Sequence, residues 1–462
     1  MPEQIAQGIN RDARRAWAYL SVTLLWAALA AGGFPFPHMD DPFFVGAGLN
    51  LAQGGSLVNP LMEGTTHFYS YPPLQSYLLA GWLKLFGVSV GSMVAMYVVI
   101  SWAATLFVIR TFQILNREFL GVLVALCVVI YATSSGMRPD DFALFFAALS
   151  FRLGVSPGAR FRFFAPCCAF LAMCSTPAAM AIMLPWIVYL AVTDKSMWKA
   201  ILAGAAATAA LIGAMVDWKV TDFLTGFLYN NHDAHEIVLS WLETYWDRPM
   251  GLVKLFYPTV TICTVIFLAA SRRGFRVMDA VALLSLVLGL YTIFNTVSGH
   301  RVLGIITVIA IGYYIDLLAP HSRWNRILVA ANALLIAASG VRPLVQGVST
   351  RRTADGPALL HEIQRIHPAR IIMDDWSLRY VFNYHLIPGM TAINYSDADH
   401  SRSQLASQKF PDECWVLSAE SVRRWQLPPH GLPVPRYVSF AGKHIGDWLS
   451  NAGEIGVSPP GK

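Results

Sequence analysis

The chain has 462 residues, of which 55% are hydrophobic and only 13% are charged, and its mean hydropathy is positive. Soluble domains carry about 25% charged residues, so this composition excludes an ordinary soluble protein and favours a multi-span membrane protein. The net charge of +6 comes from arginines beside apolar runs and not from one basic face, so no nucleic-acid partner is expected.

Apolar runs recur from Trp17 to Val345, and most reach the roughly 20 residues that a helix needs to cross a bilayer. We predict eleven spans, at residues 16–33, 89–109, 119–134, 140–152, 162–175, 177–193, 199–216, 251–270, 278–295, 302–319 and 327–345. The first has no Ala-x-Ala cleavage pattern, which indicates an uncleaved signal anchor. The ambiguous segment 72–87 contains Lys84, and we interpret it as an interfacial or re-entrant helix.

Basic residues are unevenly divided between the two sets of connections. With a cytoplasmic N-terminus, the cytoplasmic connections hold fifteen basic residues: Arg11, Arg14, Arg15, Arg110, Arg117, Arg152, Arg160, Arg162, Lys195, Lys199, Arg272, Arg273, Arg276, Arg323 and Arg326. The outer connections hold six: Lys84, Arg138, Lys219, Arg248, Lys254 and Arg301. This asymmetry follows the positive-inside rule and predicts that the polar motifs face outward.

The first outer loop, residues 34–88, begins with His38-Met39-Asp40-Asp41-Pro42. Carboxylates are costly near hydrocarbon, so this pair is either a functional site or an ordinary loop acid that marks the end of the span. An Asp before a Pro favours a helix start, so we predict that Asp41 caps a helix running to about Gln53. Asp40 has no such role and is the predicted general base, with Asp41 as cap or supporting residue.

The predicted helix carries a stripe of Phe44, Ala47, Gly48 and Leu51, which indicates packing at the membrane surface. Further along the loop, His67 and Tyr71 precede Pro72-Pro73, where a second helix is expected to begin. Tyrosine at a membrane interface is usually an anchor, and a contact to a ligand is the alternative for both residues.

Two arginines begin or flank later spans on the outer side. Arg138-Pro139-Asp140-Asp141 is typical of a helix start with acids at its positive end, and Arg138 is also a candidate contact for a donor phosphate. His300-Arg301 lies at the outer end of another span, where the arginine either extends to the interface or binds phosphate.

The outer connection 217–250 contains His232, His235 and Glu236, which could hold a divalent cation, although their spacing matches no zinc motif. We favour a loop on the acceptor side or a lid loop, and we expect no metal site and no cofactor. Five of the six cysteines lie in apolar runs, so no disulfide framework is expected.

The composition changes after the last span, and residues 346–462 are predicted to form a small extracytoplasmic α/β domain. Buried strands are expected at 370–373 and 414–417, with helices near 375–385 and 419–425. Asp374-Asp375 either faces a ligand or, in the interpretation we favour, caps the next helix. The tail 456–462 is expected to be disordered.

Four motifs in this order resemble the GT-C superfamily of membrane glycosyltransferases, in the branch of the protein O-mannosyltransferases and the lipid A aminoarabinose transferase. They are Asp40-Asp41 after the first span, Tyr71-Pro72-Pro73-Leu74, Arg138 to Asp141, and Ser175-Thr176-Pro177. The resemblance covers roughly residues 10–320. It implies a transmembrane glycosyltransferase domain over residues 1–345.

The resemblance implies transfer of a sugar from a polyprenyl-phosphate donor to a hydroxyl of an envelope glycolipid, polysaccharide or protein. Asp40 would be the base and Asp140 the acid of the later helix start, and His38 and His300 would support the site. Asp41 stands where the mannosyltransferases have Glu, and Tyr71 stands where the aminoarabinose transferases often have Lys. The expected location is the bacterial-type inner membrane, with the site facing the periplasm.

Two other classes of function remain as alternatives. A transporter or flippase of lipid-linked sugars would have two related halves with Gly- or Pro-interrupted spans and charges near the midplane, and no such repeat is evident. A non-catalytic partner subunit would tolerate substitution of both Asp40 and Asp140.

Overall fold

The computed structural model describes residues 2–35, 41–59 and 72–230, four short strands, and isolated helical residues at 280, 284, 287, 327 and 334. The helices are α1 (Pro2–Ala31), α2 (Asp41–Ala52), α3 (Leu74–Phe86), α4 (Val90–Ile114), α5 (Glu118–Ser135), α6 (Pro139–Gly154), α7 (Ala159–Phe163), α8 (Ala165–Met173), α9 (Met180–Thr193), α10 (Met197–Met215) and α11 (Val220–Asn230). A 3-10 turn, η1 (Pro177–Ala179), precedes α9. Of the last four predicted spans, only these isolated residues are described, in 278–295 and 327–345.

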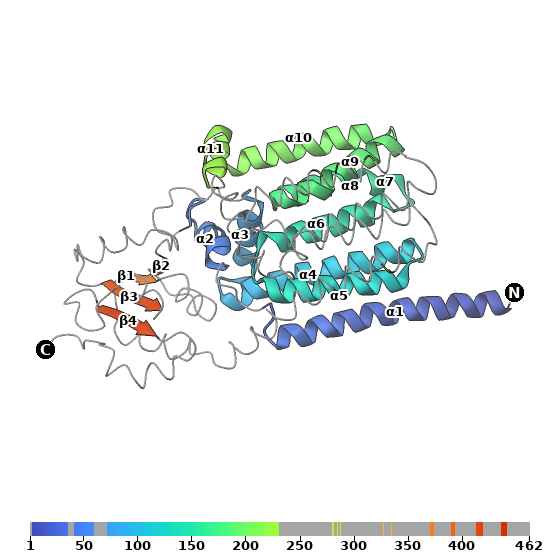
Figure 1. Ribbon diagram of the computed structural model, residues 1–462, viewed down its shortest axis with the longest axis horizontal. Helices are drawn as coiled ribbons and strands as arrows, with labels where there is room; N and C mark the ends of the chain where they lie inside the picture. Colours follow the sequence, from blue (N-terminus) through green and yellow to red (C-terminus); the bar gives the residue numbers. More distant parts are fainter. Residues whose placement is uncertain are drawn as a thin grey trace, which may run out of the picture.

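The long helices form an antiparallel bundle, in which α4 packs on α5 and α6, α8 packs on α6 and α10, and α1 packs on α4 (Figure 1). One end, called the loop-helix end, carries α2, α3, α11 and the turn between α5 and α6. The opposite end, called the basic end, carries the turns that precede α5, α7 and α10, and α1 extends beyond it. The described connections therefore alternate between the two ends as the predicted topology requires.

Small and aromatic residues make the bundle core. Ala147 of α6 and Ala165 and Ala169 of α8 are all fully buried, and alanine at a helix contact lets two backbones approach closely. On the α9 side, Trp186 is also fully buried, and its Nε1 donates to Ser150 Oγ at 3.0 Å. Alanine is common in both α6 and α8 because these two helices share a close interface.

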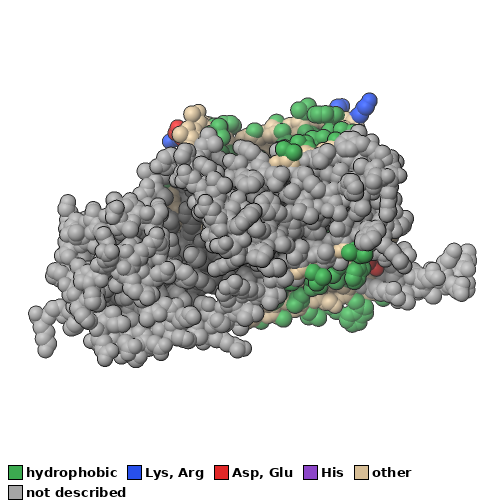
Figure 2. All heavy atoms as spheres, viewed as in Figure 1, with side chains coloured by type: hydrophobic (Ala, Val, Ile, Leu, Met, Phe, Trp, Pro, Cys, Tyr) green, Lys and Arg blue, Asp and Glu red, His purple; other side chains and the backbone are tan. Residues whose placement is uncertain are grey.

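Within the described residues, two helices are long and apolar enough to cross a membrane, namely α4 with 25 residues and α10 with 19. Shorter apolar segments are Arg15–Ala31, Glu118–Thr133 and Ile182–Thr193. Large hydrophobic side chains point outward from several of these helices, as Figure 2 shows along α10. These features support association of the bundle with a membrane.

The helices correct several predicted boundaries. The first helix begins at Pro2, well before the predicted residue 16. The predicted span 162–175 is divided at Phe164 into α7 and α8, and Pro166, which has no N–H to donate, lies in the first turn of α8. The predicted span 177–193 starts with the 3-10 turn η1 and has Pro185 inside α9.

The two helices of the first loop pack on each other, and their lengths match the sequence interpretation. α2 ends at Ala52, followed by Gly54 with φ of +89°. Three residues of the predicted stripe are buried, among them Phe44 at 3% and Ala47 at 0% exposure, and Leu51 is partly buried. α3 has 13 residues, about 20 Å of helix, which is too short for the hydrocarbon core and supports the interfacial interpretation.

Four strands form one parallel sheet in the order β2 (Met390–Ala392), β1 (Arg370–Met373), β3 (Glu413–Ser418), β4 (Arg436–Phe440). Ile371 pairs with Met390 on one side and Cys414 on the other. The strands predicted at 370–373 and 414–417 are confirmed, and β2 and β4 were not predicted. In Figure 1 the sheet lies beyond the loop-helix end. The helices predicted near 375–385 and 419–425, Asp374-Asp375 and the tail 456–462 lie outside the described residues.

Candidate functional site

Three of the predicted site residues, Asp41, Arg138 and Asp140, lie within the described residues, and the structure brings them together at the loop-helix end. The other predicted site residues, His38, Asp40, His67, Tyr71, His300 and Arg301, lie outside the described residues, as does the loop 231–250. The described part of the site is formed by the starts of α2 and α6 and by the helices around them.

The start of α6 has the geometry that the Arg-Pro-Asp-Asp motif predicts. α5 ends at Gly136, whose φ of +77° favours glycine, and Arg138 is extended. Pro139 is the first helical residue, so its missing N–H costs no hydrogen bond. Asp140 and Asp141 lie in the first turn, where the helix dipole stabilises negative charge. The motif therefore fixes two carboxylates at one end of the bundle.

Arg138 is buried between α6 and α2. Its side chain is 7% exposed, and Nε lies 3.6 Å from Asp140 Oδ2. On the other side, the guanidinium carbon lies 4.9 Å from the centre of the Phe44 ring of α2, within the range of a cation–π contact. The sequence predicted a helix start here and, as a hypothesis, an arginine that contacts a donor phosphate. The structure shows the helix start, with the arginine held by an ion pair and an aromatic ring.

Asp140 joins a third helix to this arrangement. Its Oδ2 accepts a hydrogen bond from the hydroxyl of Tyr131 in α5, at 3.2 Å, on the same oxygen that faces Arg138. The Asp140 side chain is 1% exposed. Tyr131 and Arg138 therefore both face the same carboxylate oxygen of Asp140 and hold it in place.

Asp41 ties the first loop to the bundle. It is completely buried, and its Oδ1 accepts from the backbone N–H of Met137 at 2.9 Å, across 96 residues of sequence. The sequence assigned Asp41 a local capping role, and this long-range bond was not predicted. Because Met137 immediately precedes Arg138, the bond places the start of α2 against the start of α6.

Asp141 completes a group of three carboxylates around one arginine. Electrostatic interactions link Asp141 to Asp140, Arg138 and Asp41. Among the described residues of this group, carboxylates outnumber the arginine by two. A buried excess of negative charge favours a proton or another cationic group nearby. One arginine alone therefore does not balance the charge of three ionised carboxylates.

Tyr97 of α4 was missed by sequence reasoning. It is 1% exposed, its hydroxyl accepts a hydrogen bond from the Gln75 amide of α3, and it interacts electrostatically with Asp141 and Asp41. Its ring meets the Phe142 ring edge-on, with centroids 5.5 Å apart. A tyrosine in an apolar run looks like ordinary core, so no signal in the sequence identified it. We call Asp41, Tyr97, Tyr131, Arg138, Asp140 and Asp141 the carboxylate cluster.

The Ser175-Thr176-Pro177 motif is buried at the start of η1. Ser175 and Thr176 are 0% and 2% exposed, and Ser175 Oγ donates to the Leu171 carbonyl at 2.9 Å. This bond engages one of the last carbonyls of α8, which lack helical partners. In the described contacts, the serine of this motif therefore ends a helix.

No group of three His, Cys, Asp or Glu side chains suited to hold a metal ion is present among the described residues. No protein-family model matches the chain, and no curated protein or solved structure is significantly similar to it. Any functional conclusion therefore depends on the motifs and on the geometry of the carboxylate cluster.

Proposed function

We propose that the chain is an eleven-span membrane glycosyltransferase with a small C-terminal α/β domain. It transfers a sugar from a polyprenyl-phosphate donor to a hydroxyl of an envelope glycolipid, polysaccharide or protein at the periplasmic face of the inner membrane. Asp40 is the general base. The observation that carries the proposal is the carboxylate cluster, in which the helix that follows Asp40 meets the Arg138–Asp141 helix start.

The proposed reaction needs one base and one stabilised leaving group. The acceptor oxygen forms a bond to the anomeric carbon as the bond from that carbon to the phosphate oxygen breaks, and Asp40 takes the hydroxyl proton. Polyprenyl phosphate leaves with the bonding electrons. The charge on it would be stabilised by Arg138, Arg301, His67 or Tyr71, with His38, Asp140 and His300 supporting the site.

The bond of Asp41 to Met137 supports different roles for the two acids of the pair. A carboxylate that is fully buried and holds two helix starts together is suited to a structural role. Its neighbour precedes the helix and is the member of the pair left for proton transfer. The pair would thus divide into Asp41 as the anchor and Asp40 as the base.

The proposed orientation agrees with the positions of the charges. The connections rich in arginine and lysine lie at the basic end, and the carboxylate cluster lies at the opposite end (Figure 1). The positive-inside rule puts the basic end in the cytoplasm and the cluster outside. Nucleotide sugars are cytoplasmic, so an outward-facing transferase needs a donor that has already crossed the membrane, and a lipid-linked sugar meets this need.

The test compares Asp40→Asn with Asp222→Asn in a strain that lacks the gene. Asp222 is an exposed acid in the first turn of α11, at the same end of the bundle. The Asp40 variant is expected to insert normally but to leave the lipid-linked sugar unused, as measured by mass spectrometry of polyprenyl-phosphate sugars and envelope glycans. The Asp222 variant is expected to restore the glycan.

Near-normal glycan from the Asp40 variant would remove Asp40 from the mechanism. A Met39→Cys chain that an impermeant maleimide labels only after the cytoplasm is opened would overturn the orientation. Movement of lipid-linked sugar across liposomes without transfer to an acceptor would favour the flippase instead.

A further inference from the structure

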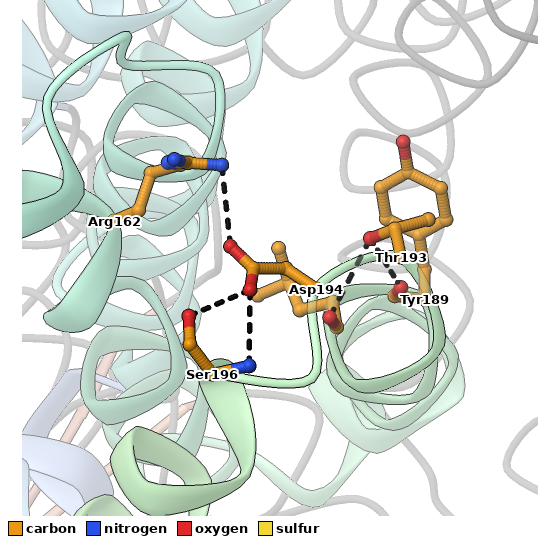
Figure 3. Close-up of polar contacts among 6 residues, drawn as sticks. Arg162, Tyr189, Thr193, Asp194 and Ser196 are labelled. Carbon is orange, nitrogen blue, oxygen red and sulfur yellow. Dashed lines mark hydrogen bonds and ion pairs between the residues drawn. The ribbon is translucent and has the colours of Figure 1, made fainter.

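The basic end carries a second organised set of charges, on the turn that precedes α10 and on α7. Asp194 lies between them: its Oδ2 is 3.4 Å from Arg162 Nη1, and its Oδ1 accepts from Ser196 N at 3.0 Å and Ser196 Oγ at 2.6 Å (Figure 3). The hydrogen bonds from Ser196, together with Arg162, lower the pKa of Asp194. The ionised carboxylate thus holds the turn against α7 and neutralises Arg162.

Three further cations on these elements are exposed, namely Arg160, Lys195 and Lys199. α10 packs closely on α8, since a Cβ on Gly204 of α10 would lie 3.2 Å from the backbone nitrogen of Cys167 in α8. Both helices run from the basic end, and Lys199 and Arg162 each lie five residues before these contacts. The Asp194–Arg162 pair brings the turn before α10 against α7, so the exposed cations of both elements lie at the same end of the bundle.

Aromatic side chains lie among these cations. Phe161, Phe164 and Trp198 are 60%, 57% and 54% exposed, so their rings lie on the surface of the bundle. Trp198 and Leu202 are one helical turn apart, and Leu202 is 66% exposed, so both belong to the same outward face of α10. Figure 2 shows Lys and Arg side chains at the edge of the molecule beyond the hydrophobic side chains of α10.

We propose that this basic-aromatic surface, made of Arg160, Phe161, Phe164, Lys195, Trp198 and Lys199, binds the headgroup of an anionic phospholipid. The cations match the phosphate, the aromatic residues suit the headgroup region, and the apolar face of α10 next to them suits an acyl chain. A soluble anion would need the cations but would leave this apolar continuation without a partner. The surface therefore selects a lipid.

This inference depends on the membrane placement of the bundle and goes beyond sugar transfer. The cytoplasmic leaflet is rich in anionic lipids, and each nearby lysine or arginine strengthens binding to it. A lipid bound across α7 and α10 would join two elements that Asp194 already links. The surface would thus fix the depth of the basic end in the membrane.

The test uses the full-length protein in detergent and measures bound lipid by native mass spectrometry. Phosphatidylglycerol is compared with phosphatidylcholine of the same acyl chains. The variant K195Q/K199Q is expected to lose roughly tenfold in phosphatidylglycerol affinity, with phosphatidylcholine binding unchanged. The matched control K84Q/K219Q removes two lysines from the loop-helix end and is expected to keep the affinity of the unmodified protein.

Two results would overturn the inference: equal binding of the two lipids by the unmodified protein, or an equal loss in the two lysine variants. Adding Arg160→Gln to K195Q/K199Q is expected to lower the affinity for phosphatidylglycerol further. Because neither donor nor acceptor is present, the outcome is independent of whether the chain transfers sugar.

Discussion

Charged residues are buried at one end of the bundle and exposed at the other. At the loop-helix end, Asp41, Asp140 and Asp141 are no more than 1% exposed, and each is held among partners from other helices. At the basic end, Arg162 and Asp194 meet with side chains that are 36% and 30% exposed. Buried charges are expensive and need fixed partners, while exposed charges are screened and adjust freely.

This difference supports placing the proposed chemistry at the loop-helix end. A cluster of buried carboxylates around one arginine costs stability unless each group is paired, so its presence in an apolar bundle suggests a function. The exposed charges of the basic end carry little such cost, and they are suited to orienting the bundle in a membrane and to the proposed lipid contact. Substitution of a charged residue should therefore change the free energy of unfolding more at the loop-helix end than at the basic end.

The largest effect is expected from Arg138→Met. Removing the guanidinium leaves Asp140 and Asp141 buried without their cation, which costs about 3–5 kcal/mol. Arg160→Met at the basic end removes an exposed arginine and is expected to change stability by less than about 0.5 kcal/mol. Thermal unfolding in detergent and the amount of protein in the membrane measure both. Equal stability of the two variants would contradict the contrast between the ends.

Gly48→Ala tests the packing that holds α2 at the cluster. A Cβ at Gly48 would lie 2.9 Å from the Ser76 carbonyl oxygen of α3, so α2 and α3 would have to separate. Such overpacking costs about 1–3 kcal/mol, which thermal unfolding would detect. The control is Gly81→Ala, whose Cβ meets nothing within 4 Å and which should stabilise α3 by about 0.5–1 kcal/mol. If both alanines stabilise the protein, the close contact is absent.

Tyr131→Phe removes a single hydroxyl from the cluster. The loss of a buried hydrogen bond to a carboxylate is expected to cost about 1.5–3 kcal/mol. Tyr19→Phe, near the basic end, removes a part-buried bond to Gln113 and should cost about 1 kcal/mol or less. The measurement is again thermal unfolding. A larger loss of stability from Tyr19→Phe than from Tyr131→Phe would contradict the prediction that polar contacts contribute more at the loop-helix end.

The sequence predicted the helices better than it predicted the site. Apolar runs, Pro139 and Gly54 located the helices because length and turn chemistry are local properties. The division of 162–175 at Phe164 was missed, since Pro166 can begin a helix as readily as interrupt one. Within the site, the Asp41–Met137 bond joins residues 96 apart, and Tyr97 resembles core until α3 is placed beside it. Such contacts depend on tertiary packing, which no local pattern encodes.

The smallest effect is expected from Asp194 at the basic end. The pKa of Asp194 is lower in the folded protein, so its ionised form favours folding above the pKa of an unfolded aspartate. That contribution is lost as the pH falls through the lowered pKa. Because the carboxylate is exposed, added salt should weaken its pair with Arg162, and Asp194→Asn should barely change the melting temperature at neutral pH.

The measurement is the melting temperature against pH for the unmodified protein and the Asn variant, at low and high salt. The two curves should converge at acidic pH, where the carboxylate is protonated. A destabilisation by Asp194→Asn as large as that of Arg138→Met would mean that the basic end, too, depends on fixed charge pairs. The charged residues at the two ends would then contribute equally to stability, and the ends would differ only in how exposed these residues are.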